Sequence, residues 1–234
     1  MLDWLLKRSA QLMPQTAVGH LGWLRGAVGA FFGILSAGGI TVLILGAGNP
    51  ALPWLVAPMG ASAVLVFAVP ASPLAQPWSV IAGNLLSTAI GLLMGSAFGT
   101  PLLAASLAVG SAIAVMSLTR SLHPPGGACA LLCALGAAGH DHWTLFVMVP
   151  VALNVSALAA AGWFYNNLTG HPWPHHVKAP TPGESSGLAY THADLEAVLE
   201  DWNEVLDVDI DDLDAIYQAL HRRVARRASG AGGS

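Results

Sequence analysis

Residues 77–118 read PWSVIAGNLLSTAIGLLMGSAFGTPLLAASLAVGSAIAVMSL and contain no charged side chain. They belong to a longer run, because Arg120 is the only charged residue between Gly26 and His140. A water-soluble domain of this size leaves much of its chain at the surface, so a run of this length cannot lie in one soluble core. The bilayer is the better solvent for it. We therefore predict an integral membrane protein that crosses the bilayer several times.

The composition of the whole chain agrees with a membrane protein. Of its 234 residues, 54% are hydrophobic and 9% are charged, against about 25% charged in an average soluble domain. The formal net charge is −4, and the acidic residues gather in Glu184–Asp214, outside the apolar region. No basic stripe points to nucleic acid as a partner. Cys129 and Cys133 lie inside an apolar segment, one helical turn apart, and we expect them to be core residues without a disulfide.

Six apolar membrane elements are predicted: Leu21–Leu45, Ala51–Val69, Pro77–Phe98, Pro101–Leu118, His123–Ala138 and Trp143–Tyr165. A spanning helix needs about 20 apolar residues. The second element is interrupted by Pro58 and Gly60, and the fifth is short and opens with two prolines. The predicted fold class is therefore all-α: a polytopic transmembrane bundle of four full spans plus two broken or re-entrant helices.

Residues 57–66, APMGASAVLV, resemble residues 124–133, PPGGACALLC, at an offset of 67. Each copy lies between two spans, and the span that follows carries an isolated asparagine, Asn84 or Asn154. We interpret this as two three-element repeats, residues 21–99 and 101–166. Chance similarity between stretches rich in Ala, Gly and Leu is the alternative. Three crossings per repeat would invert one repeat relative to the other, as in many transporters, whereas re-entrant elements would leave four crossings.

Further segments flank the transmembrane domain, which we place at residues 21–170. They are a cytoplasmic amphipathic lead-in at 1–20, a linker at 171–189 and a cytoplasmic helical hairpin at 190–228. Both crossing schemes put the two termini on one side of the membrane. The positive-inside rule makes that side the cytoplasm, because of Lys7, Arg8, Arg25, Lys178 and the basic tail. The predicted location is the bacterial inner (plasma) membrane.

Three motifs closely resemble the HPP integral membrane family: APMGASAVL at 57–65, SPLAQPW at 72–78 and SLHPPGGA at 121–128. The family is named for a His-Pro-Pro motif, which stands here at residues 123–125. The resemblance extends from about Gly22 to Tyr165. It implies a domain usually described with four transmembrane helices, and a link to nitrite transport, with which plastid and cyanobacterial members are associated. Many bacterial members continue into CBS domains; the acidic tail resembles their lead-in, and the sequence leaves a continuation open.

The chemistry of an anion site is expected at the two Pro/Gly-opened helix starts. The first amides of a helix lack a helical partner, and the macrodipole adds a partial positive charge there. Two such starts facing each other would bind an anion without a formal cation. The candidate substrate-binding residues are Pro58, Gly60, Ala61, Ser62, Asn84, His123, Pro124, Pro125, Gly126, Gly127, Ala128 and Asn154. Arg120 is a candidate gating or electrostatic residue.

Structural roles compete with each of these assignments. The prolines can simply kink a helix, and His123 can cap one or, when protonated, couple transport to protons. Interhelical bonding is the commoner use of an intramembrane asparagine. Arg120 at a helix end can reach the lipid headgroups instead.

The sequence thus predicts a transporter or channel for a small monovalent anion, nitrite by the resemblance. We expect no cofactor, no metal and no enzymatic activity, because GxxxxGK[ST], GxSxG and HExxH patterns are missing. The expected partners are the inorganic anion, the bilayer and a second copy of the chain, most simply as a dimer. The alternative is a membrane sensor or scaffold that signals through the tail. Selectivity, coupling ion, direction and channel or carrier behaviour stay open.

Overall fold

The computed structural model describes residues 22–46, 53–140, 142–176, 191–202, 208 and 210–230. In these ranges the secondary structure is helical, with no strand. The elements are α2 (Gly22–Leu45), α3 (Pro58–Ala68), η1 (Pro73–Ala75), α4 (Pro77–Ala97), α5 (Pro101–Leu118), α6 (Pro124–Ala138), η2 (Leu145–Val147), α7 (Met148–Leu168), α8 (His192–Trp202) and α9 (Ile210–Gly230).

Among the described residues, four helical stretches are long and apolar enough to cross a membrane: Gly22–Leu45, Pro77–Ala97, Pro101–Leu118 and Leu145–Leu168. Helices α3 and α6 are also apolar but have only 11 and 15 residues. At 1.5 Å per residue they rise about 16 and 22 Å, less than a hydrocarbon core of about 30 Å. The all-α class with four full spans and two shorter apolar helices is confirmed. The division into inverted repeats stays a prediction.

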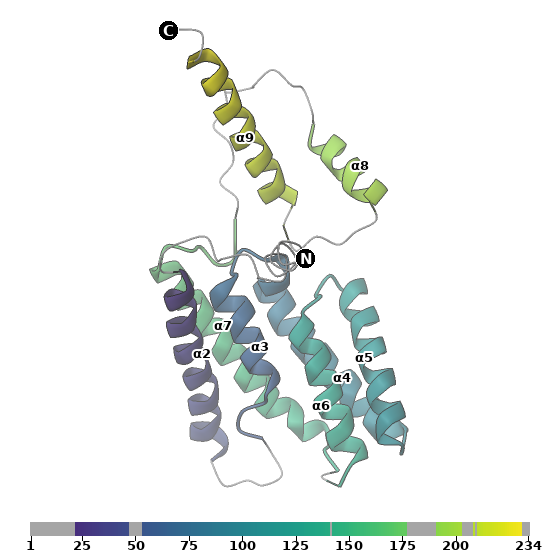
Figure 1. The fold of residues 1–234 in the computed structure, drawn as a ribbon. Helices are drawn as coiled ribbons and strands as arrows, with labels where there is room; N and C mark the ends of the chain where they lie inside the picture. The colour runs from purple at the N-terminus through teal and green to yellow at the C-terminus, as the bar shows by residue number, and fades with distance from the viewer. Residues whose placement is uncertain are drawn as a thin grey trace, which may run out of the picture.

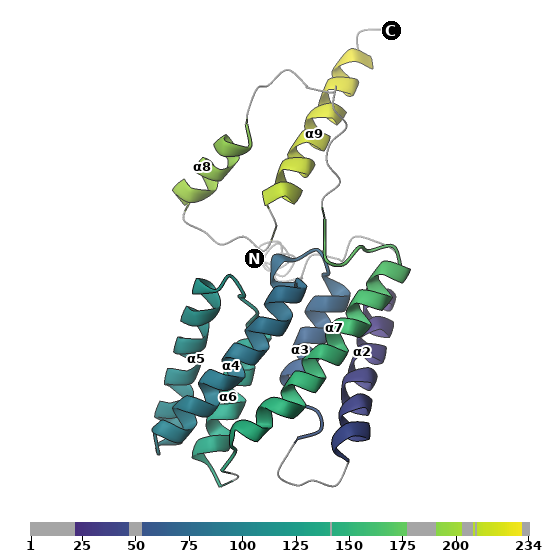
Figure 2. The same cartoon turned by 180° about the vertical axis from the view of Figure 1, so that it is seen from behind.

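Successive helices from α2 to α7 alternate in direction across the bundle (Figure 1, Figure 2). The start of α2 therefore lies beside the ends of α3 and α7, and Arg25 joins the three. Its guanidinium donates to the Phe67 carbonyl at 2.8 Å, to Asn166 Oδ1 at 2.9 Å and to Thr169 Oγ1 at 3.2 Å. We call this side of the bundle the Arg25 face.

Both short helices begin inside the bundle, each after a stretch of non-helical backbone. Pro58 and Pro124 stand at the first helical position, where a missing N–H breaks no helical bond. Val56, just before α3, donates its N–H to Asn154 Oδ1 in the first half of α7, at 2.9 Å. His123, just before α6, is extended (φ −143°, ψ 105°). The chain thus enters the bundle as irregular backbone before each short helix and only then forms the helix.

Helices α4 and α6 pack against each other through glycine. A methyl group at Gly91 would overlap the carbonyl oxygen of Ala130, and one at Gly95 would lie 2.5 Å from the carbonyl oxygen of Ala134. Lipid gives helices no hydrophobic drive to associate, so such small-residue faces supply the close packing instead. The α4–α6 contact consequently has no free space at these two levels.

The tail helices lie beyond the Arg25 face (Figure 1). Thr191 and Asp194 form a capping box at α8: the Thr191 N–H donates to Asp194 Oδ2 at 2.7 Å, and the Asp194 N–H donates to Thr191 Oγ1 at 3.3 Å. The hydrogen bonds from the backbone and side chain of Thr191 hold the pKa of Asp194 below its usual value. Helix α9 begins with acidic residues and has Arg227 in its last turn, which suits the helix macrodipole.

The glycine packing predicts a difference between two alanine substitutions. Gly91→Ala should lower the thermal midpoint of the purified protein, since overpacking costs about 1–3 kcal/mol. Gly110→Ala in α5 should leave the midpoint unchanged, because a methyl group there meets nothing within 4 Å. Both variants are heated in nanodiscs, and the folded fraction is read by size-exclusion chromatography. Equal midpoints would contradict the packing described for α4 and α6.

Candidate functional site

A cluster of buried polar side chains lies where α3, α4 and the start of α6 meet. Ser62 of α3, Asn84 of α4 and His123 before α6 are 0% exposed, and Cys129 of α6 is 1% exposed. We call these four residues the His123 cluster. Polar groups at this depth must find partners within the protein, because lipid offers none.

The four side chains form one continuous chain of hydrogen bonds. Cys129 Sγ lies 3.1 Å from Asn84 Oδ1, and Asn84 Nδ2 lies 3.2 Å from Ser62 Oγ. Ser62 Oγ lies 2.9 Å from His123 Nε2. On the other side of the ring, His123 Nδ1 lies 2.8 Å from the carbonyl oxygen of Leu74. The chain therefore joins α6, α4 and α3 to the segment that contains η1.

The direction of every bond follows from the carbonyl at the end of the chain. The Leu74 oxygen can only accept, so His123 Nδ1 carries a proton and donates it. In the neutral imidazole Nε2 is then an acceptor, and the Ser62 hydroxyl must donate to it. Ser62 Oγ in turn accepts from Asn84 Nδ2. Every donor in the His123 cluster is thus used by a neighbour.

The cluster brings together two positions that the proposed repeat makes equivalent. Ser62 and Cys129 are separated by 67 residues, the repeat offset. Both bind the same side chain, Ser62 at the amide nitrogen of Asn84 and Cys129 at its amide oxygen. A third contact, from Asn84 Nδ2 to the Val80 carbonyl at 2.8 Å, fixes the amide on its own helix. One asparagine therefore holds α3 and α6 to α4.

The helix starts offer fewer free amides than the sequence suggested. Because α6 begins at Pro124, the two residues that would present N–H groups are prolines, and Gly126 donates to the His123 carbonyl at 2.8 Å. At α3, Met59 and Gly60 donate to Val56 and Ala57, both at 3.0 Å. The amides of Gly126, Met59 and Gly60 are therefore paired within their own helix starts.

One polar side chain beside the cluster has no partner. Ser87 lies one turn after Asn84 on α4, is 0% exposed, and its Oγ has no hydrogen bond; it is the only buried side-chain oxygen or nitrogen of the described residues in that state. It faces the first turn of α6, since a methyl group at Gly126 would lie 2.9 Å from Ser87 Oγ. A buried hydroxyl without a partner is uncommon. Ser87 therefore marks a spare donor at the helix start.

Comparison with known proteins shows the family of the chain. The sequence matches the family described as HPP, transmembrane region, over residues 15–174, more than half of the chain. The chain belongs to the HPP family. The His-Pro-Pro motif is thus the segment that carries His123 into the buried cluster and starts α6.

Two curated relatives of this HPP protein are transmembrane proteins of Dictyostelium discoideum. One is 38% identical over 117 residues, which cover 48% of this chain and 41% of the relative. The other is 36% identical over 118 residues, which cover 49% of this chain and 38% of the relative. The match thus spans less than half the length of these relatives. No solved structure matches the chain.

Asn154, the second candidate asparagine of the HPP domain, has a separate set of partners. Its Oδ1 accepts from the Val56 N–H, and its Nδ2 donates to Thr41 Oγ1 at 2.7 Å and to the Trp54 carbonyl at 3.0 Å. These bonds join α7 to α2 and to the segment before α3. The structure does not bring Asn154 into hydrogen-bond contact with the His123 cluster.

The other candidate residues divide by burial. Pro58, Pro125 and Gly126 are buried, whereas those on the outer sides of the two helix starts are exposed or half-buried: Gly60, Ala61, Pro124, Gly127 and Ala128. A methyl group at Gly60 or Gly127 would meet nothing within 4 Å.

Arg120 is exposed, follows α5 and has a positive φ of 52°. Among the residues that the structure describes, no group of three or more His, Cys, Asp or Glu is placed to hold a metal ion.

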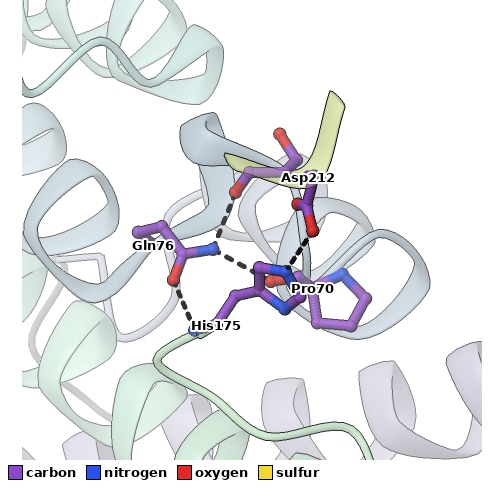
Figure 3. A network of polar contacts seen from close by, with 5 residues as sticks. Pro70, Gln76, His175 and Asp212 are labelled. Carbon is purple, nitrogen blue, oxygen red and sulfur yellow. Dashed lines mark hydrogen bonds and ion pairs between the residues drawn. The ribbon is translucent and has the colours of Figure 1, made fainter. Parts of the chain in front are cut away.

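Hydrogen bonds link the segment between α3 and α4 to the tail through His175 (Figure 3). Gln76 Nε2 donates to the Pro70 carbonyl at 3.0 Å, and Gln76 Oε1 accepts from the His175 N–H at 2.8 Å. His175 Nε2 lies 3.0 Å from Asp212 Oδ1 on α9. The same segment supplies the Leu74 carbonyl to His123. Sequence reasoning did not identify Leu74, Gln76 or Ser87 as part of the site.

Two serine substitutions should differ in their effect on stability. Ser62→Ala leaves His123 Nε2 and one Asn84 N–H without partners, and a buried unsatisfied group costs about 1–3 kcal/mol, so the thermal midpoint should fall. Ser87→Ala removes a hydroxyl that has no partner and should leave the midpoint unchanged or raise it. Ser106→Ala is the control, because that exposed hydroxyl bonds only its own helix. A lower midpoint for Ser87→Ala than for Ser62→Ala would contradict the hydrogen-bond assignments.

Proposed function

We propose that this HPP protein is a transporter or channel for a small monovalent anion, and that nitrite is the substrate to test first. The observation that carries the proposal is a buried cluster of uncharged donors at the point where two short helices begin inside the bundle. Substrate sites formed near the midplane by discontinuous helices are a common arrangement in transporters.

The charge inventory favours an anion over a cation. From Gly22 to Leu168 the sequence has two basic residues, Arg25 and Arg120, and one acidic residue, Asp141. A cation would need carboxylates or a ring of carbonyls, and the His123 cluster contains no carboxylate. Its donors are hydroxyl, amide and imidazole groups, which stabilise negative charge. Because they are uncharged, a monovalent ion suits them better than a divalent one, whose desolvation is far more costly.

The site would have to open for an anion to bind. Its hydroxyl, amide and imidazole donors now bond one another, so the oxygens of nitrite would replace those internal bonds. Ser87 is the exception, because its hydroxyl is already available beside Gly126. We therefore assign Ser87 and the His123 cluster as the binding residues, and the conformation described here as a closed one.

A catalytic role is a weaker interpretation of the same residues. Ser62 and His123 are at the distance of a nucleophile and its base. However, Ser62 Oγ also accepts from Asn84, which lowers its nucleophilicity, and the first two residues of α6 are prolines, which have no N–H to stabilise an oxyanion. Both side chains are also 0% exposed. These features support binding rather than acyl transfer.

The location and assembly inferred from the sequence belong to this proposal. We propose a bacterial inner membrane location with both termini in the cytoplasm, which places the Arg25 face on the cytoplasmic side. We also propose a homodimer. Cysteine accessibility at Ser117 and Ser96, on opposite sides of the bundle, tests the orientation. The mass of the protein in nanodiscs tests the assembly.

Ser87→Ala tests the binding site in proteoliposomes. Loss of one donor to an anion costs about 1.5–3 kcal/mol, so the apparent affinity for nitrite should fall about tenfold or more, with protein stability unchanged. Ser106→Ala should transport like the parent protein. Nitrite uptake no greater than into protein-free vesicles would overturn nitrite as the substrate, and uptake unaffected by Ser87→Ala would remove Ser87 from the site.

Gly127→Leu distinguishes transport from the sensor or scaffold alternative. Gly127 lies in the first turn of α6 and faces open space, so leucine should fold there but cover the helix start. Gly110→Leu is the matched control, since Gly110 also faces open space but lies in α5. We expect nitrite uptake to fall at least tenfold in Gly127→Leu only. A protein that signals without transport predicts no such difference.

A further inference from the structure

The hydrogen bonds of the His123 cluster all run toward one atom that can take up a proton. The thiol of Cys129 donates to Asn84, the Asn84 amide to Ser62, and the Ser62 hydroxyl to His123 Nε2. The remaining acceptors are amide and peptide oxygens or a hydroxyl, which are far weaker bases than imidazole. His123 Nε2 is therefore the place where a proton arriving in the cluster is held.

A proton on Nε2 reverses the bond between His123 and Ser62. The imidazolium donates from both ring nitrogens, so Nε2–H must point at Ser62 Oγ, which already accepts from Asn84. The oxygen can accept both bonds with its two lone pairs. Its own hydrogen is then displaced from the ring nitrogen and turns away from the ring. Protonation thus releases a hydroxyl donor and creates a positive charge within a few ångströms of each other.

Among the residues that the structure describes, no neighbouring group compensates this charge. The described elements packed against His123 present Ser62 from α3, Gly83 and Asn84 from α4, and the Leu74 carbonyl beside η1, all of them uncharged. The other titratable side chain of the His123 cluster is the Cys129 thiol of α6. It is joined to His123 only through Asn84 and Ser62. Arg120, on the same segment as His123, is exposed. An imidazolium at 0% exposure without a counter-ion costs several kcal/mol.

An anion beside His123 would remove this cost and accept the freed Ser62 hydroxyl. We propose that the protein binds one proton on His123 together with each anion and carries the two across as a neutral pair. The inference rests on the proposed function and names its coupling ion. Linkage makes the coupling reciprocal: the anion raises the proton affinity of His123 by the same factor by which the proton raises the affinity for the anion.

The proton leaves with the anion, so charge balances over the cycle. It enters His123 Nε2 from the side of uptake and is released on the other side, where loss of the anion makes the buried imidazolium unfavourable again. Ser62 then donates to Nε2 as it does in the closed conformation. No net charge moves, and a pH difference alone can drive accumulation.

The test uses the full chain in proteoliposomes with nitrite as the probe and protein-free vesicles to subtract leakage of nitrous acid. A neutral one-to-one pair predicts accumulation of about tenfold for each pH unit of inward gradient. It also predicts proton uptake in equal amount, followed by an internal pH dye, and no effect of a potassium–valinomycin potential. His123→Gln keeps an acceptor for Ser62 but cannot take a proton. Any remaining uptake should lose its response to pH and gain a response to potential.

The outcomes separate the coupling from the proposed function. Nitrite uptake that is driven by potential and carries no proton overturns the coupling and leaves the anion transporter in place. Unchanged pH dependence in a folded His123→Gln protein also overturns it. No uptake above protein-free vesicles under any gradient overturns the proposed function and the coupling with it. Should His123→Gln fail to fold, the proton-to-nitrite ratio of the unmodified protein decides the question.

Discussion

Backbone that leaves the helical path inside a bilayer must satisfy its polar atoms within the protein. In this protein the constraint acts twice: a buried asparagine meets it before α3, and before α6 the Ser121 N–H donates to the Met116 carbonyl while the His123 carbonyl accepts from Gly126. Asn154 accepts from the Val56 amide and donates to the Trp54 carbonyl, which holds the segment before α3. Asn84 binds Ser62 and Cys129, which holds the helix that the His-Pro-Pro segment begins. The rest of the site depends on these two amides, because Asn154 holds the backbone before α3 and Asn84 ties α3 and α6 to α4.

The membrane class, the lengths of the apolar elements and the starts of the two short helices could be predicted from the sequence. The charge-free run predicted the membrane class, and the length of each apolar stretch separated the four long spans from the two short elements. Pro58 and Pro124 marked the helix starts correctly, since proline suits the first helical position. The Gly91 and Gly95 face was also visible as a spacing of four. These are local properties of composition and period, and such properties are encoded over a few residues.

The contacts of the site could not be predicted, because they join residues far apart in the sequence. Ser62 meets His123 across 61 positions, and Leu74 meets it across 49. The number of free amides at the start of α6 differs from the expectation for another reason. A helix leaves its first four amides without helical partners, and here the first two residues, Pro124 and Pro125, have no N–H, while Gly126 donates to the His123 carbonyl. The unpaired Ser87 hydroxyl, by contrast, depends on packing that no pattern encodes.

The absence of a fixed charge in the described cluster bears on how a solute could move. Conduction requires binding that is favourable enough for entry and weak enough for release. A permanent cation at this depth would bind an anion strongly and release it slowly, and without an anion it would be an uncompensated buried charge. A histidine avoids both problems on the proposed mechanism, because its charge exists only while the anion is present. The placement of Arg25 supports this view. Its guanidinium binds Phe67 and Asn166 at the ends of α3 and α7, and so it joins helix ends at one side of the bundle. The fixed charge thus stabilises the bundle at its end, and the titratable group occupies the interior.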